Sequence, residues 1–148
     1  MVDLQTLVNE LSEGNTLGNM LELDPQLNEA LYSIGYALYQ QAKYSEALKY
    51  FSCSAHLDHY DNKSLKAKAK CLKKMGEFEK AIKIFSIANL FESNDVESLM
   101  DIVECLLKTG KSQDAQQFID LMIKEYGEIQ GCKEIIERCR KIKELLRN

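Results

Sequence analysis

Three tyrosines at helical spacing, Tyr32, Tyr36 and Tyr39, are the side chains best placed to do chemistry in this sequence. Residues at i, i+4 and i+7 project from one side of a helix. A separate apolar series that includes Leu31 and Leu38 marks another side, so the helix carries two apolar stripes. One stripe can build the fold, while the phenol rings and their hydroxyls face a ligand. Packing of the tyrosines against the N-terminal segment is the alternative.

Catalytic patterns are missing from the sequence. It has no Ser/His/Asp, Cys/His or paired-carboxylate arrangement typical of an enzyme. His56 and His59 are expected to be turn and packing residues, and Glu97 and Glu104 to be ordinary helix charges. We therefore expect a protein that is not an enzyme and needs no cofactor.

The five cysteines, an odd number, favour a reducing cytosol. Cys71 and Cys105 occupy equivalent positions of an internal repeat and are expected to be small core residues. Cys132 and Cys139 share a helical face, but without CxxC spacing we expect no zinc site.

The tyrosine helix opens a helical hairpin, residues 31–61, whose pattern recurs after 34 and again after 68 residues. The repeated positions are Leu31, Leu65 and Leu99; Leu38, Leu72 and Leu106; Ala47, Ala81 and Ala115; Phe51, Phe85 and Ile119; and, at the turn, Ala42, Gly76 and Gly110. This period with small–aromatic–small punctuation is the signature of tetratricopeptide repeats. The sequence therefore predicts an all-α fold, with three such repeats in a short right-handed solenoid.

Composition limits the partner classes. The chain has 148 residues, 45% of them hydrophobic, with a single proline and a net charge of −4. An acidic chain disfavours nucleic acid as a partner, and no apolar run is long enough for a membrane span. The first residues lack the basic-then-apolar layout of a signal peptide, so we expect a cytoplasmic location.

The predicted repeats occupy residues 28–130, after an N-terminal helical extension, 1–27, and before a capping helix, 131–148. Thr16 is a predicted N-cap, Asp24-Pro25 a predicted helix start, and ESND (92–95) the cap of a later helix. Residues 2–12 are expected to form an amphipathic helix that mediates self-association. Its apolar side carries Val2, Leu4, Leu7, Val8 and Leu11.

Repeat register extends the tyrosine positions to a predicted concave groove, because the first helix of each repeat lines that side. The equivalents are Lys66, Lys70 and Lys73 in the second repeat, and Met100, Glu104 and Leu107 in the third. The groove should thus be aromatic at one end, cationic in the middle and mixed at the other. Three adjacent cations predict an acidic or acid-flanked ligand segment. A merely solvated lysine face is the alternative.

Several stretches together resemble the class II chaperones of bacterial type III secretion, which bind translocator proteins. They are EGNTLGNML before the repeats, LYSIGYALYQQAKYSEALKYF, the LDHYD junction, KMGEFEKAIKIF and VECLLKTGKSQDA. The resemblance implies a concave groove that holds an extended translocator segment with tyrosines at positions 32, 36 and 39. It also implies homodimers formed through the N-terminal helices. Lys66 and Lys70 depart from the family, which tends to have small or apolar residues there.

The sequence thus predicts a cytoplasmic chaperone that keeps hydrophobic translocators unassembled before export, without inserting into the membrane itself. A general tetratricopeptide adaptor that joins folded proteins is the alternative.

Overall fold

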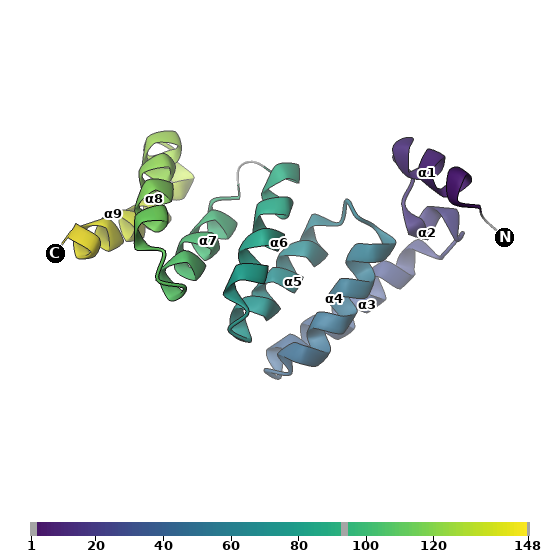
Figure 1. Ribbon diagram of the computed structural model, residues 1–148. Helices are drawn as coiled ribbons and strands as arrows, with labels where there is room; N and C mark the ends of the chain where they lie inside the picture. The colour runs from purple at the N-terminus through teal and green to yellow at the C-terminus, as the bar shows by residue number, and fades with distance from the viewer. Residues whose placement is uncertain (1–2, 93–94, 148) are drawn as a thin grey trace. The chain divides into compact units, whose positions relative to one another are not determined.

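The computed structural model describes residues 3–92 and 95–147 and divides into two compact units, Met1–Cys71 and Leu72–Asn148 (Figure 1). We call them the N-terminal and C-terminal units. Every regular element in the described ranges is helical, which confirms the all-α prediction. The boundary between the units falls inside the predicted second repeat, and the predicted domain limits at 27 and 130 remain a prediction.

The helices follow one another with short connections. They are α1 (Leu4–Ser12), α2 (Leu17–Met20), α3 (Pro25–Gln40), α4 (Tyr44–Leu57), α5 (Asn62–Lys74), α6 (Phe78–Phe91), α7 (Val96–Lys108), α8 (Ser112–Tyr126) and α9 (Lys133–Arg147), with a 3-10 turn, Gln130–Cys132, before α9. None of the helices in the described ranges is long and apolar enough to cross a membrane.

Side-chain caps fix several helix starts as the sequence predicts. Thr16 accepts a hydrogen bond from the Asn19 amide at 3.2 Å, and Asp24 accepts one from the Gln26 amide at 2.9 Å. Asp95 caps α7 in the same way, whereas the rest of the predicted ESND cap, at 93–94, lies outside the described residues, as does Val2 of the predicted N-terminal helix.

The turns that end α3, α5 and α7 repeat one backbone geometry. The turn residues all have positive φ: Ala42 at 58°, Gly76 at 80° and Gly110 at 74°. After each, an amide donates back across the turn to a leucine carbonyl: Lys43 to Leu38, Glu77 to Leu72 and Lys111 to Leu106, at 3.0, 2.9 and 2.9 Å. The left-handed conformation lets these amides satisfy a carbonyl at the end of each helix and reverses the chain within a few residues. The 34-residue period is therefore present in the backbone as well as in the sequence.

Small residues let the helices of the N-terminal unit approach closely. α3 packs along α4, and a Cβ placed on Gly35 would lie 2.9 Å from the Phe51 ring. Phe51, Ala47 and Cys71 are buried together, and Tyr32 and Tyr39 pack partly against them. The first hairpin therefore closes around Phe51.

The C-terminal unit is more completely packed. α7 lies against α6, α8 and α9, and α9 also packs on α8, as expected of a capping helix. Phe85 and Ile119 are fully buried, in the role that Phe51 has in the first hairpin.

The cysteine prediction is confirmed. Cys71 and Cys105 are fully buried free thiols, and burial raises the pKa of each to about 11. Cys139, another 34 residues on, is buried as well. Thiols with a pKa this high stay protonated at neutral pH, so they act as packing groups rather than as nucleophiles.

Candidate functional site

The side chains of Tyr32, Tyr36 and Tyr39 lie along α3, and we call them the tyrosine face. Tyr36 is 50% exposed, whereas Tyr32 and Tyr39 are partly buried. The Tyr32 ring stacks on Tyr36 with centroids 6.3 Å apart and tilts against Phe51 at 5.4 Å. Tyr39 meets the Tyr44 ring edge-on at 5.2 Å. Tyr32 thus braces Tyr36, whose ring is half exposed to solvent on a support that is itself packed against Phe51.

Lys63 closes one end of the tyrosine face. Its ammonium lies 3.8 Å from the centroid of the Tyr32 ring and 3.5 Å from a Glu29 carboxylate oxygen. Burial raises the pKa of Tyr32, and the nearby Lys63 charge only partly opposes that rise. The Tyr32 hydroxyl therefore stays protonated near neutral pH and can still donate a hydrogen bond.

The predicted lysine row divides between different environments. Lys70 is exposed and Lys66 is partly buried. Lys73 lies in the C-terminal unit, where its ammonium is 2.5 Å from an Asp101 carboxylate oxygen and also pairs with Glu104. Lys73 therefore already has two carboxylates as partners in its own unit, and the acidic ligand segment predicted from the three cations stays a prediction.

Glu104 links this pair to α9. It also pairs with Arg138, whose guanidinium nitrogen is 2.6 Å from the other carboxylate oxygen. Burial alone would raise the pKa of Glu104, but the hydrogen bonds and charges of Lys73 and Arg138 outweigh it and lower the pKa. For Lys73, burial alone would lower the pKa, and the bonds to Asp101 and Glu104 raise it. The two cations and the two carboxylates form a network whose net charge is zero.

Met100 is not on the surface, although register placed it in the groove. It is 3% exposed, and its sulfur lies 3.8 Å from that of Cys139. Leu107 is partly buried. Within the C-terminal unit, the third-repeat positions therefore contribute packing and an ion pair more than open apolar surface. The groove that would join the nine predicted residues remains a prediction.

The apolar side of α1 is open. Leu4 is 76% exposed and Val8 and Leu11 are also exposed, while Leu7 is partly covered. No residue of α1, all of which is described, is buried. A stripe of this kind is what a self-associating helix presents, and the role remains a prediction.

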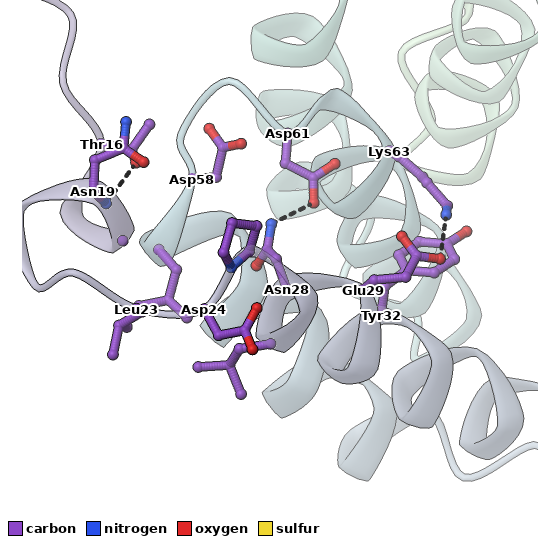
Figure 2. Close-up of a pocket in the computed structure, with 14 residues that line it drawn as sticks. Thr16, Asn19, Leu23, Asp24, Asn28, Glu29, Tyr32, Asp58, Asp61 and Lys63 are labelled. Atoms are coloured by element: carbon purple, nitrogen blue, oxygen red, sulfur yellow. Dashed lines mark hydrogen bonds and ion pairs between the residues drawn. The ribbon is translucent and has the colours of Figure 1, made fainter.

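A pocket that sequence reasoning missed lies beside the tyrosine face, and we call it the junction pocket. Its volume is about 340 Å³, and Figure 2 shows that its lining comes from α2, the start of α3 and the α4–α5 junction. The apolar part of its wall is formed by Leu23, Leu27 and Leu57. Carboxylates of Asp24 and Asp58 add negative charge.

Tyr32 and Lys63 also line the junction pocket, so it meets the end of the tyrosine face. Its wall is held by a polar network in which the Ser54 hydroxyl lies 2.8 Å from Asn28 Oδ1 and 3.2 Å from Asp61 Oδ2. The buried Ser64 hydroxyl donates to Ser54 at 2.9 Å. Satisfied buried polar groups of this kind hold a wall rigid. The LDHYD junction supplies three of the lining residues, Leu57, Asp58 and Asp61, and was the available signal in the sequence.

This surface carries groups suited to binding. It offers an exposed phenol ring, a neutral hydroxyl, and a pocket that accepts one side chain. No cluster of three or more histidine, cysteine or acidic side chains in the described part of the chain could hold a metal ion.

Comparison with solved structures identifies proteins with a similar fold. The chain has a TM-score of 0.76 and 27% identity to the translocator chaperone SycD of Yersinia enterocolitica, crystallised with a peptide of the translocator YopD, covering 84% of this chain and 95% of SycD. It has a TM-score of 0.86 and 23% identity to a chain of a type III secretion complex from Aeromonas hydrophila, covering 97% and 95%. The predicted resemblance to the class II translocator chaperones is confirmed.

A homologue is also found by sequence. Low calcium response locus protein H of Yersinia pestis is 38% identical over 53 residues, which are 36% of this chain. The match spans about a third, 32%, of that relative's length. No family model matches the chain.

Proposed function

We propose that this protein is a cytoplasmic chaperone of type III secretion that binds an extended segment of a hydrophobic translocator. The observation that carries the proposal is Tyr36, a half-exposed ring braced by Tyr32 on an amphipathic helix of a chaperone fold. SycD has been crystallised with a peptide of YopD, and PcrH with the chaperone-binding regions of PopD and PopB. The activity is binding, without a cofactor.

The tyrosine face would bind its client through ring area and hydroxyl hydrogen bonds together. An extended segment presents side chains alternately, so every second residue can contact a ring while hydroxyls of tyrosine fix the register. Binding to the tyrosine face lowers the concentration of free client, and therefore the amount of exposed apolar segment that can aggregate. A client side chain that passes Tyr32 next meets Lys63 and the junction pocket.

The lysines of α5 add a preference for acidic residues near the client segment. Lys70 is exposed on α5 and raises the local positive potential, and Lys66 is one turn away on the same helix. Lys73 does not contribute to this preference, because Asp101 and Glu104 neutralise its charge. We therefore place the acidic residues of the client opposite Lys66 and Lys70.

The protein would act as a homodimer assembled through α1. Leu4, Val8 and Leu11 are exposed along one side of that helix. SycD, whose fold this chain shares, has been crystallised as a dimer in alternative forms.

Affinity capture from the cytosol of the bacterium that carries this chain tests the proposal. The tagged wild type should retain a secreted protein with a membrane-inserting apolar segment, and Tyr36→Ala should lose most of it. Tyr60→Ala is the matched control, because Tyr60 is 48% exposed in the same unit but belongs to the α4–α5 connection rather than to α3. Retention of compact folded proteins by all three would instead favour the adaptor.

A further inference from the structure

The junction pocket combines its apolar wall with an excess of negative charge. The described residues that line it include four acidic side chains, Asp24, Glu29, Asp58 and Asp61, against one basic side chain, Lys63. Glu29 pairs with Lys63, whose ammonium lies 3.5 Å from its carboxylate oxygen. Among the residues that the structure describes, the three aspartates form no ion pair with a lysine, arginine or histidine. The pocket therefore has more negative charge than its own cation can balance.

Two of these aspartates keep a carboxylate oxygen available for a ligand. Asp24 uses Oδ1 to accept the Gln26 amide and Asp58 uses Oδ1 to accept the Tyr60 amide, each at 2.9 Å. Within the described chain, Oδ2 of both residues has no hydrogen-bond partner. Asp61 instead uses both oxygens inside the polar network of the wall. The two available oxygens come from different elements, the start of α3 and the α4–α5 junction (Figure 2).

Charge is distributed unevenly along the sequence that builds this unit. Residues 1–42 contain six acidic residues and no lysine, arginine or histidine. α5 contains six lysines and no acidic residue. Nearby sequence therefore supplies no cation to the pocket from the side of α2 and α3, and its negative potential acts on a ligand over about a Debye length, near 8 Å in physiological salt.

The mouth of the pocket already holds one cation. The Lys63 ammonium lies 3.8 Å from the centroid of the Tyr32 ring and also contacts Glu29. An aromatic face with a carboxylate beside it attracts a positive charge from both sides. This contact shows that the surroundings of the pocket stabilise a cationic head group, and Asp24 and Asp58 are the acceptors that Lys63 leaves unpaired.

The shape and charge of the pocket together favour a long side chain with an apolar stem and a cationic head. A volume of about 340 Å³ admits one such side chain. The leucine wall suits the methylene stem, since arginine and lysine pack their stems on apolar surface and keep the charge in a polar region. A guanidinium has five N–H donors in a planar fork, so it can reach two carboxylates on different elements at once. A purely apolar side chain would desolvate the aspartates without giving them a partner.

We propose that the junction pocket binds an arginine side chain of the client. The inference rests on the chaperone function proposed above, and it gives the bound segment a direction. The arginine lies at the end of the segment next to Tyr32, and the acidic residues of the client lie further along, opposite Lys66 and Lys70. Lys63 and Lys70 are seven residues apart on α5, about 10 Å, which an extended chain covers in about three residues. The client motif is therefore a basic residue and an acidic residue separated by at least three positions.

Titration of Nα-acetyl-arginine amide into the full-length ¹⁵N-labelled protein tests the pocket without a client. We expect saturable shifts of backbone amide signals from Asn28, Leu57 and Asp61, which line the pocket. Nα-acetyl-citrulline amide has the same length but an uncharged head, and it should bind at least fivefold more weakly. Equal affinity of the two amides would show that the pocket does not read charge. Shifts confined to other parts of the chain would place the arginine elsewhere; either result overturns the proposal.

Paired substitutions test the two aspartates. Asp24→Asn with Asp58→Asn keeps an oxygen for each backbone amide but removes both charges, and it should weaken binding of the arginine amide about tenfold. Asp3→Asn with Glu46→Gln is the matched control, because it removes two charges of the same unit outside the pocket, and it should change binding less than twofold. Both variants should keep the circular dichroism of the wild type. Equal affinities of the two variants would overturn the assignment.

The pocket and the chaperone function can fail separately. If the tagged protein captures a translocator and Tyr36→Ala loses it, but the arginine amide does not bind, the arginine pocket is wrong and the chaperone function stands. If the arginine amide binds as expected and no translocator is captured, the pocket stands as an arginine site and its assignment to a translocator client is wrong.

Discussion

Helices α3 and α7 open hairpins of the same 34-residue pattern, yet their surroundings differ. α7 lies among α6, α8 and α9 and buries seven residues: Val96, Ser98, Met100, Ile102, Val103, Cys105 and Leu106. α3 packs mainly along α4, with Lys63 of α5 against its Tyr32, and buries only Gly35. The position of a helix in the series of hairpins, more than its composition, therefore determines whether its side chains stay exposed and able to bind a ligand.

The tyrosine face illustrates the difference at matched positions. Tyr32 corresponds by register to Met100, and Tyr36 to Glu104. Met100 is in the core and Glu104 is held between two cations, whereas Tyr36 is half exposed. On this account α3 supplies recognition and α7 supplies stability.

Truncation of Met100 should have the largest effect on stability. Met100→Ala leaves a cavity beside Cys139 and should lower the free energy of unfolding by about 2–5 kcal/mol. Tyr36→Ala removes a ring that is already half in water and should cost less than about 1 kcal/mol. Urea unfolding followed by circular dichroism measures both. Equal losses would remove the distinction between the two helices.

Removal of the Lys73 charge should have the next largest effect. Lys73→Met removes the cation shared by Asp101 and Glu104 in a partly buried site and leaves only Arg138 paired with Glu104, at a cost of about 1–3 kcal/mol. Lys70→Met, one turn earlier at an exposed position, is the control and should change stability by less than about 0.5 kcal/mol. Similar values for the two variants would mean that the network is a solvated surface feature.

Acid should act on the same network. The pKa of Glu104 is lowered in the folded protein, so its stabilising contribution is present above the unfolded pKa, near 4.5, and is lost as pH falls through the folded value. Wild-type stability should therefore drop on acidification below that pH, and Lys73→Met should drop less. Urea midpoints between pH 6 and pH 3 measure the slopes. If the urea midpoints of wild type and Lys73→Met fell with the same slope against pH, Glu104 would be excluded as a source of the acid sensitivity.

Charge reversal on α5 should affect client binding rather than folding. Replacing Lys66 and Lys70 by Glu should weaken binding of an acid-flanked client segment up to about tenfold at low salt, mainly by slowing association. The wild type should lose affinity as salt rises, and the double variant should not. Stopped-flow association at two salt concentrations measures this. Binding indifferent to both changes would leave recognition to the tyrosines alone.

The smallest effect is expected at the first turn. Ala42 has a φ of 58°, a left-handed conformation that costs an alanine about 1 kcal/mol, and glycine stands at the two equivalent turns. Ala42→Gly should therefore raise the free energy of unfolding by about 0.5–1 kcal/mol, while Gly110→Ala should lower it by about 1 kcal/mol. Thermal unfolding distinguishes the two signs. A destabilising Ala42→Gly would show that chain entropy outweighs the strain.

Sequence patterns predicted what local chemistry and period determine. The hairpins follow from apolar spacing, the caps at Thr16 and Asp24 from residue type, and the turns from the Ala42, Gly76 and Gly110 series. These features depend on neighbours within a few residues, which is the range over which sequence signals are strongest.

Depth of burial and contacts between distant segments were not predictable in the same way. Register gave the side of α7 on which Met100 lies but not how completely α9 and its neighbours cover it. The pairing of Lys73 with Asp101 joins residues 28 positions apart. The junction pocket requires the start of α3 to meet the α4–α5 junction. Such contacts depend on helix packing geometry, which residue spacing leaves open.

Titration of the captured client segment against wild type, Tyr36→Ala and Tyr60→Ala tests the central claim most directly. Isothermal calorimetry should show that Tyr36→Ala loses about 1–3 kcal/mol of binding free energy, the scale of a buried aromatic contact. Tyr60→Ala should bind as the wild type does, and all three should unfold at nearly the same temperature. Unchanged affinity of Tyr36→Ala, or a large fall in its melting temperature, would place Tyr36 outside the binding surface and contradict the account.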